Sequence, residues 1–142
     1  MASSLGFHRK ATGKPLWVLV LLGTWLSAAT PAGAYSILHN FGISTSDGNS
    51  PLASLILDAA GNLYGTTGDG GPGSMEGCFW GCGTVFTLMT DGTGYTISHF
   101  FNSLTGDGAG PYASLILDPA GNFYGTTPGG GSLGYGTVFM MP

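Results

Sequence analysis

Apolar residues in this chain gather in short runs that are separated by glycines and small polar residues. Four of these runs cover residues 53–58, 62–67, 84–89 and 95–101. In the last run the large side chains take every second position, at Tyr95, Ile97, His99 and Phe101. This spacing places them on one face of a strand. After residue 34, glycines interrupt every apolar run before a helical period is established. The pattern predicts an all-β fold of short strands joined by turns.

The same pattern is encoded twice. The segment LDAAGNLYGTT starts at Leu57, and the segment LDPAGNFYGTT starts at Leu117, sixty residues later. The tetrapeptide GTVF starts at Gly83 and again at Gly136, at an offset of fifty-three. The first copy therefore has seven additional residues, within the segment PGSMEGCFWGC. Such self-similarity predicts two repeat units, at about residues 35–94 and 95–142.

Each unit is predicted to form four antiparallel strands, the number in one blade of a β-propeller. The chain opens with a strand of the fourth kind at 35–41, continues with a full unit at 53–101 and closes with three strands at 113–141. This order predicts about two propeller-like blades, with the 35–41 strand available to complete the last one. Because known propellers have about four to eight blades, two blades do not close a ring. We therefore expect a ring of several copies, a fragment of a longer repeat protein, or a small sandwich-like object.

Residues 1–34 have the three regions of a secretory signal peptide. Cations come first, an apolar run follows at 16–29, and small residues at 32–34 form a cleavage site. The apolar run is shorter than the ~20 residues of a membrane-spanning helix. We expect a helical signal peptide at 1–34, a secreted or periplasmic repeat domain at 35–142, and no membrane span after cleavage. An uncleaved membrane anchor is the alternative.

Charge is divided unevenly along the chain. All three cationic residues lie before residue 35, and all seven acidic residues lie after it. The predicted mature domain therefore has no Lys or Arg and a formal charge of −7. This composition argues against nucleic-acid binding, which draws its affinity from cations placed on phosphates. Without carboxylate–cation pairs, the fold must depend on apolar burial, backbone pairing and turn hydrogen bonds.

The ordered motifs resemble one known family. The segments GTVFTL, DGTGYTISHFF, DGAGPYASLILD and LDAAGNLYGTT follow the pattern of the GloVer tandem-repeat family over essentially all of residues 35–142. The D-x-x-G-N-x-Y part is also similar to NHL-type propeller repeats. The resemblance implies a propeller-like, secreted or surface-anchored bacterial repeat protein. It brings no catalytic residues to this chain.

The repeated turn motif places an acid and a tyrosine at fixed positions. Asp58 and Asp118 end a strand, where a carboxylate accepts hydrogen bonds from backbone amides two residues on. Tyr64 and Tyr124 present a flat apolar ring with a polar tip. We predict that the two tyrosines pack between sheets, and we also count them as candidates for a binding surface.

A calcium site is an alternative role for four of the acids. We predict that Asp47, Asp58, Asp107 and Asp118 accept hydrogen bonds in turns, because each lies in an Asp-Gly or Asp-x-x-Gly context. Carboxylates and glycine carbonyls are also the hard oxygen ligands that calcium prefers. No complete EF-hand motif is present in the sequence. Apart from calcium, no cofactor is expected.

His39 and His99 take equivalent positions in the two units. We predict a core or edge histidine that is hydrogen-bonded to a neighbouring loop. A metal-binding role is the alternative, and it would need further ligands from distant parts of the chain.

The additional residues of the first unit contain the two cysteines, Cys78 and Cys82. A close pair in an exported protein favours a disulfide. Two free thiols, a redox role, or part of a zinc site are the alternatives. Phe79 and Trp80 lie between the cysteines. They form either a rigid exposed tip that binds a partner, or a lid with Trp80 folded onto the sheet.

No motif of a serine nucleophile is present, although paired-carboxylate hydrolysis stays open. We therefore predict a secreted, non-enzymatic module for extracellular or cell-surface interactions. Its expected partners are other copies of itself, other extracellular proteins or glycans. One alternative is a lectin-like carbohydrate binder that uses the aromatic loop 72–82. Another is a fragment of a metal-dependent propeller hydrolase or lyase.

Overall fold

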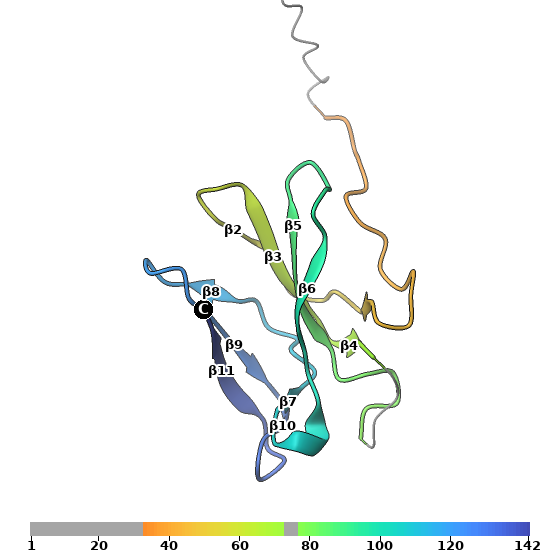
Figure 1. Ribbon diagram of the computed structural model, residues 1–142, viewed down its shortest axis with the longest axis vertical. Coiled ribbons are helices and arrows are strands. Elements are labelled where there is room, and N and C mark those ends of the chain that lie inside the picture. The colour runs from red at the N-terminus through yellow and green to blue at the C-terminus, as the bar shows by residue number, and fades with distance from the viewer. Residues whose placement is uncertain (1–32, 73–76) are drawn as a thin grey trace, which may run out of the picture. The chain divides into compact units, whose positions relative to one another are not determined.

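The computed structural model describes residues 33–72 and 77–142 (Figure 1). Within these ranges every regular element is a β-strand, except for one 3-10 turn, η1 (Ser103–Thr105). The predicted all-β class is therefore confirmed. Residues Tyr35–Pro142 form one compact unit. The predicted signal peptide lies outside the described residues, apart from its last two positions.

The first sheet has four antiparallel strands in the order β2-β3-β5-β6, and its last strand is built from the start of the predicted second unit. Its strands are β2 (Ile56–Leu57), β3 (Asn62–Thr67), β5 (Thr84–Met89) and β6 (Thr96–Phe100). β3 and β5 pair over their full length, and β-branched and aromatic residues in both fit a pleated, half-buried surface. A bulge between Val85 and Phe86 shifts the register of β5 against β6. The four strands predicted for a complete unit are present, although the first covers only Ile56–Leu57 of the predicted 53–58.

The second repeat unit contains a three-stranded antiparallel sheet with the order β11-β9-β8. Its strands are β8 (Ile116–Leu117), β9 (Phe123–Thr127) and β11 (Thr137–Met141). In this sheet Ile116 lies opposite Tyr124. The equivalent pair in the first sheet is Ile56 and Tyr64. The repeated sequences therefore take up the same pairing in both units.

The prediction that the N-terminal segment 35–41 is a strand is wrong, and the segment pairs with neither described sheet. Its side chains contact the first unit instead. The ring of Phe41 lies 5.1 Å from that of Phe86, and His39 stacks on Tyr95 with ring centroids 3.6 Å apart. Since these contacts hold the segment against its own first unit, β11 has no fourth strand beside it among the described residues.

Two short ladders also join the loops of each unit. β1 (Gly48–Asn49) pairs with β4 (Asp69–Gly70), and β7 (Gly108–Ala109) pairs with β10 (Gly129–Gly130). Glycine-rich strands carry few side chains that could alternate between two faces, so hydrophobic periodicity does not reveal them. In each unit the ladder pairs the loop before the long strand, β3 or β9, with the loop after that strand.

The apolar core lies between the two sheets. Its buried members are Cys82, Val85, Phe101, Leu115 and Phe123. The ring of Tyr64 lies 4.2 Å from that of Phe123 and extends the core. Burial of one large apolar side chain stabilises a fold by roughly 1.5–3 kcal/mol. Since both units contribute to this core, each one stabilises the other.

Candidate functional site

The two cysteines form a disulfide, so the favoured prediction for this pair is confirmed. The described residues contain no free cysteine. Cys82 is buried in the core, and its sulfur accepts a hydrogen bond from the amide of Ser103 at 3.5 Å. The base of the loop is thus fixed to the core and to η1, while Phe79 and Trp80 between the cysteines are exposed.

Phe79 and Trp80 form an exposed aromatic tip. The two residues are 76% and 70% exposed, and their rings meet edge to face at 5.0 Å. The carbonyl of Trp80 accepts a hydrogen bond from the amide of Gly70 at 2.7 Å, and the amide of Gly81 donates to the carbonyl of Cys78 at 3.0 Å. Of the two predicted arrangements, the structure has the exposed tip and not the lid.

Shallow hollows flank the aromatic tip on two sides. The larger, about 370 Å³, extends from Trp80 to Tyr112 and to the glycine backbone at Gly110. The smaller, about 280 Å³, lies between the tip and the side chains of Asp47 and Asn49. Each hollow therefore combines a flat ring with backbone and side-chain polar groups, which is the composition of many binding sites for small polar molecules.

Tyr112 is the aromatic residue of this site that sequence reasoning missed. It is 47% exposed and shares the larger hollow with Phe79 and Trp80. The signal was available, because Tyr112 replaces the Leu52 of the first unit and so breaks the repeat at an exposed position.

The structure does not bring Tyr64 and Tyr124 to the aromatic tip. The hydroxyl of Tyr64 donates to Asp58 at 2.9 Å, and its ring packs on the second sheet. Tyr124 donates to Asp118 at 3.1 Å and lines a separate hollow of about 200 Å³ beside Val138. The prediction that both tyrosines pack between sheets therefore holds for Tyr64 alone, whereas Tyr124 bonds its turn and lies on the open face of the second sheet.

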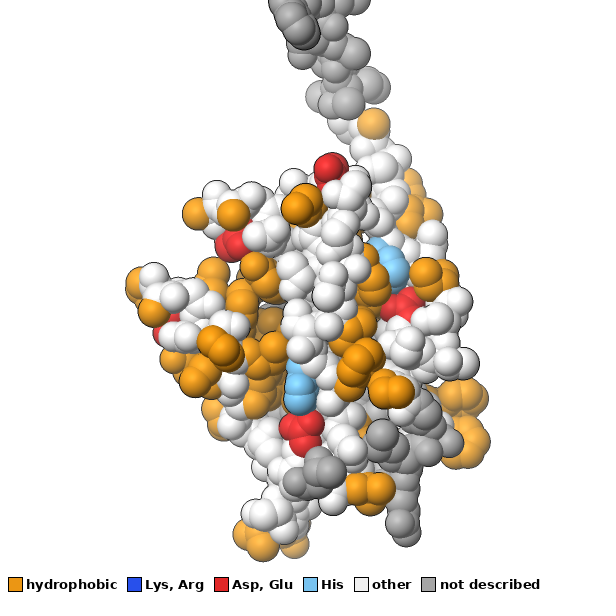
Figure 2. Space-filling model, in the orientation of Figure 1, with side chains coloured by type: hydrophobic (Ala, Val, Ile, Leu, Met, Phe, Trp, Pro, Cys, Tyr) orange, Lys and Arg blue, Asp and Glu red, His pale blue; other side chains and the backbone are white. Residues whose placement is uncertain are grey.

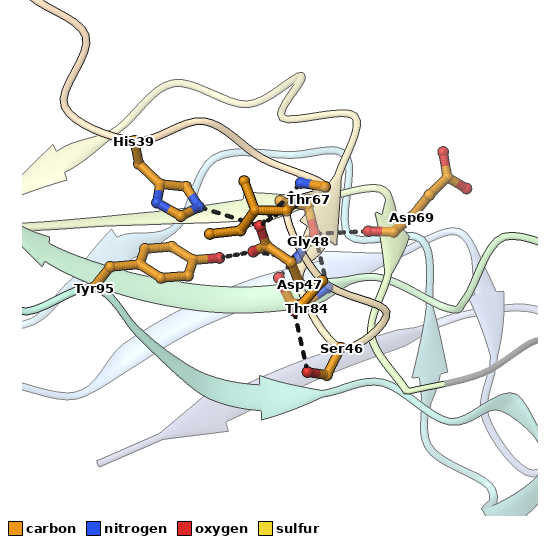
Figure 3. Close-up of polar contacts among 11 residues, drawn as sticks. His39, Ser46, Asp47, Gly48, Thr67, Asp69, Thr84 and Tyr95 are labelled. Carbon is orange, nitrogen blue, oxygen red and sulfur yellow. Dashed lines mark hydrogen bonds and ion pairs between the residues drawn. The ribbon is translucent and has the colours of Figure 1, made fainter.

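Asp47 accepts five hydrogen bonds at the edge of the smaller hollow (Figure 3). The donors are the amides of Gly42, Ile43 and Gly48, the hydroxyl of Tyr95 and, at 3.3 Å, Nε2 of His39. Burial acts to raise the pKa of the Asp47 carboxyl. The hydroxyl of Tyr95 and the backbone amides outweigh this effect and hold the pKa below its ordinary value.

A second, more open copy of this arrangement is built around Asp107. Its carboxylate lies 2.8 Å from Nε2 of His99 and accepts the amides of Asn102 and Gly108. The side chain of Asp107 is 28% exposed, against 2% for Asp47. Figure 2 shows two histidine side chains, each beside an acidic side chain, and the described residues contain no Lys or Arg.

Asp58 and Asp118 accept hydrogen bonds within their own turns, as the sequence motif predicted. Each carboxylate accepts two backbone amides, a side-chain amide and a tyrosine hydroxyl; for Asp58 the donors are Ala60, Asn62 and Tyr64. Bonds from Asn62 lower the pKa of Asp58 to about 2, and the equivalent bonds from Asn122 lower the pKa of Asp118.

The four calcium candidates lie in separate hydrogen-bonded sites. Asp47 and Asp107 each bind a histidine, whereas Asp58 and Asp118 each close a turn. Within residues 33–72 and 77–142, no group of three or more His, Cys, Asp or Glu is placed to hold a metal ion. Calcium binding by these four acids therefore stays a prediction, without a preformed cluster to support it.

Comparison with known proteins adds one match. The family model of the Gloeobacter/Verrucomicrobia repeat matches residues 22–142. The chain belongs to this repeat family. The resemblance seen in the sequence motifs is thereby confirmed. No curated protein and no solved structure matches the chain.

Membership of the Gloeobacter/Verrucomicrobia repeat family covers both units, whereas the disulfide loop interrupts the symmetry between them. Within the described part of the chain, no helix is long and apolar enough to cross a membrane.

Acid is expected to weaken this Gloeobacter/Verrucomicrobia repeat. The folded-state pKa of Asp58 is about 2, below the ordinary 3.8, so its contribution to stability is present above the ordinary value and is lost as the pH falls toward 2. Asp47 and Asp118 have pKa values lowered in the same direction. The melting temperature, measured by calorimetry from neutral pH downward, should drop steeply between about pH 4 and pH 2. A melting temperature that stays level across this window would contradict the assignment.

Proposed function

We propose that this protein is a secreted, non-enzymatic module that binds extracellular partners through the aromatic tip formed by Phe79 and Trp80. The observation that carries the proposal is the exposure of two large rings on a loop closed by a disulfide. Exposed aromatic side chains on a rigid backbone bind partners with little loss of conformational entropy. The disulfide supports an oxidising location outside the cytosol.

The two sheets act in this proposal as blades of a propeller-like scaffold. The four-stranded first sheet and the equivalent pairing in the second support this assignment. A scaffold of this kind holds loops at fixed positions, and the loop at 77–82 is the one by which the first unit differs most from the second.

The proposal gives His39 and His99 a structural role. Each histidine bonds an aspartate eight residues later, and both pairs recur at equivalent positions. One catalytic centre needs one set of groups, so a duplicated pair supports stabilisation of the loops over catalysis.

A carbohydrate is the second candidate ligand. The hollow beside Trp80 is shallow, contains the ring of Tyr112 and exposes backbone groups of several glycines. Flat rings can cover the apolar face of a sugar while nearby polar groups bond its hydroxyls. A glycan would therefore use the same residues as the proposed protein partner.

Replacement of Trp80 by alanine is expected to weaken binding about tenfold or more, because central aromatic residues dominate interface energetics. Binding is measured by a glycan array, followed by titration of tryptophan fluorescence with any oligosaccharide that is retained. Stability should change little, since the Trp80 side chain is 70% exposed. Tyr135→Ala is the matched control, because Tyr135 is 91% exposed in the corresponding loop of the second unit. Equal loss in both variants, or unchanged binding in Trp80→Ala, would refute the assignment of the site.

A further inference from the structure

The outer face of the second sheet is open, although its counterpart in the first sheet is covered. Val138 is 81% exposed, whereas the equivalent Val85 is 1% exposed. Ile116 is 67% exposed, and together with Tyr124 and Val138 it lines a hollow of about 200 Å³ with little polar surface. We call these three residues the acceptor face.

The structure shows what covers such a face, because the first sheet presents the equivalent residues to the second unit. The ring of Tyr64 packs at 4.2 Å from Phe123, and Val85 lies in the shared core. The hydroxyl of Thr66 donates to the carbonyl of Ala113 at 3.3 Å. A covering partner for the acceptor face is therefore a unit of this same repeat.

The opposite end of the domain carries the matching surface. Leu55 is 48% exposed, whereas the equivalent Leu115 is 2% exposed in the core. The segment 35–41 lies beside Leu55's unit, and its Tyr35 and Ile37 are 89% and 61% exposed. We call Leu55 and the segment 35–41 the donor end.

Segment 35–41 packs on the first sheet as the equivalent segment 95–101 packs on the second. The rings of Phe41 and Phe86 are 5.1 Å apart at 66°. Those of Phe101 and Phe139, at equivalent positions, are 5.1 Å apart at 65°. The segment thus takes the position of a fourth strand from a preceding unit, but the described residues contain no sheet with which it pairs.

Among the described residues, Asp107 has no counterpart of the tyrosine hydrogen bond that Asp47 accepts, and segment 35–41 of another copy would supply it. Asp47 accepts a 2.6 Å hydrogen bond from the hydroxyl of Tyr95, at the start of β6. Among the described residues, no tyrosine donates to Asp107. Tyr35 is the sequence equivalent of Tyr95, so a segment 35–41 placed along β11 would bring this hydroxyl to Asp107.

The geometry points to head-to-tail association of two copies, in which the donor end of one copy docks on the acceptor face of the next. Segment 35–41 adds to β11 as a fourth strand, and its Tyr35 donates to the partner copy's Asp107. By equivalence with β5 and β6, Met140 of β11 lies opposite Ser36. This interface is independent of the aromatic tip, so it goes beyond the proposed function.

The chemistry of the two surfaces is compatible with such docking. Addition of a strand to a sheet edge pairs backbone groups and leaves specificity to alternate side chains. The described surfaces contain no Lys or Arg, so the contact buries apolar groups without breaking ion pairs. Since the two surfaces differ, each copy keeps one free donor end and one free acceptor face until the assembly closes into a ring.

A pair of engineered cysteines tests both the contact and its register. The full chain carrying Ser36→Cys and Met140→Cys, expressed in a host that exports it, should form disulfide-linked dimers and larger species. Opposite residues of antiparallel strands have Cα atoms about 4.5–5.5 Å apart, within reach of a disulfide. Mass spectrometry should find the peptide link between positions 36 and 140.

The control moves one cysteine to the other face of the segment. Ile37→Cys with Met140→Cys should give much less covalent product, because neighbouring residues of a strand point to opposite faces. A chain that stays monomeric in sedimentation at every concentration would overturn the proposal. A monomer that carries the 36–140 link would also overturn it, since the chain would then close on itself.

A conservative substitution tests whether association depends on the Tyr35 hydrogen bond or only on non-specific apolar contact. Tyr35→Phe should weaken association about tenfold, because it removes one hydrogen bond to a carboxylate and no apolar surface. Tyr112→Phe, at an exposed tyrosine that lines the larger hollow beside the aromatic tip, should leave association unchanged. Equal effects of the two variants would contradict the role of Tyr35. Glycan binding at the aromatic tip is measured separately, so failure of either site leaves the other test intact.

Discussion

Replacement of Asp47 by alanine is expected to lower the free energy of unfolding by about 3–5 kcal/mol. The side chain is 2% exposed and accepts five hydrogen bonds. Its removal leaves buried donors, including the hydroxyl of Tyr95 and the amide of Gly48, without an acceptor. Domains of this size are stable by roughly 5–15 kcal/mol, so much of the total would be lost. Urea unfolding followed by tryptophan fluorescence measures the change.

Asp107→Ala is the internal control for this prediction. Asp107 takes the equivalent position but is 28% exposed, so water can replace the carboxylate for part of its donors. We expect it to lower the free energy of unfolding by about half as much as Asp47→Ala, or less. Equal losses for the two variants would show that the burial of Asp47 and its bond from Tyr95 do not matter to stability.

Gly83→Ala is expected to lower the free energy of unfolding by about 2–4 kcal/mol. Gly83 precedes β5 with φ of 91°, a conformation that residues with a Cβ atom rarely adopt. A Cβ atom there would also overlap the carbonyl oxygen of Thr67 and approach Cδ of Pro111 to 2.6 Å. Since the backbone of β3 cannot move without breaking the sheet, the strain stays. Thermal unfolding by circular dichroism measures the effect.

Gly61→Ala measures the cost of the left-handed backbone conformation without the atomic overlap that an added Cβ meets at Gly83. Gly61 has the same φ of 91°, but the nearest atom to its added Cβ would be the hydroxyl of Thr90 at 3.9 Å. We expect a loss of about 1 kcal/mol from the left-handed conformation alone. If Gly61→Ala destabilised the protein as much as Gly83→Ala, close packing at Gly83 would not explain its effect.

The strands were predictable where side chains alternate and the two units agree. β3, β5 and their equivalents lie where the sequence placed them, because large and small residues mark the two faces. The β1–β4 ladder was not predictable, since its glycines carry no side-chain pattern. Segment 35–41 was wrongly predicted as a strand, because a strand-like sequence forms a strand only when another strand lies beside it.

The chemistry of the site was predictable in part. The disulfide followed from two close cysteines, and the turn role of Asp58 followed from its motif. Exposure of Trp80 did not follow, since a tryptophan favours burial and the sequence holds no measure of the space beneath the loop. The five bonds to Asp47 come from three separate segments, and only the folded chain brings those segments together.

The disulfide makes the loop a small closed ring whose ends lie 5.1 Å apart at Cα. Both ends are fixed, one in the core and one beside it, so the residues between them can vary without changes in either sheet. Natural variation or directed evolution at positions 79 and 80 could therefore alter what the protein recognises while the scaffold keeps its stability. Libraries randomised at these two positions should yield folded members in most clones.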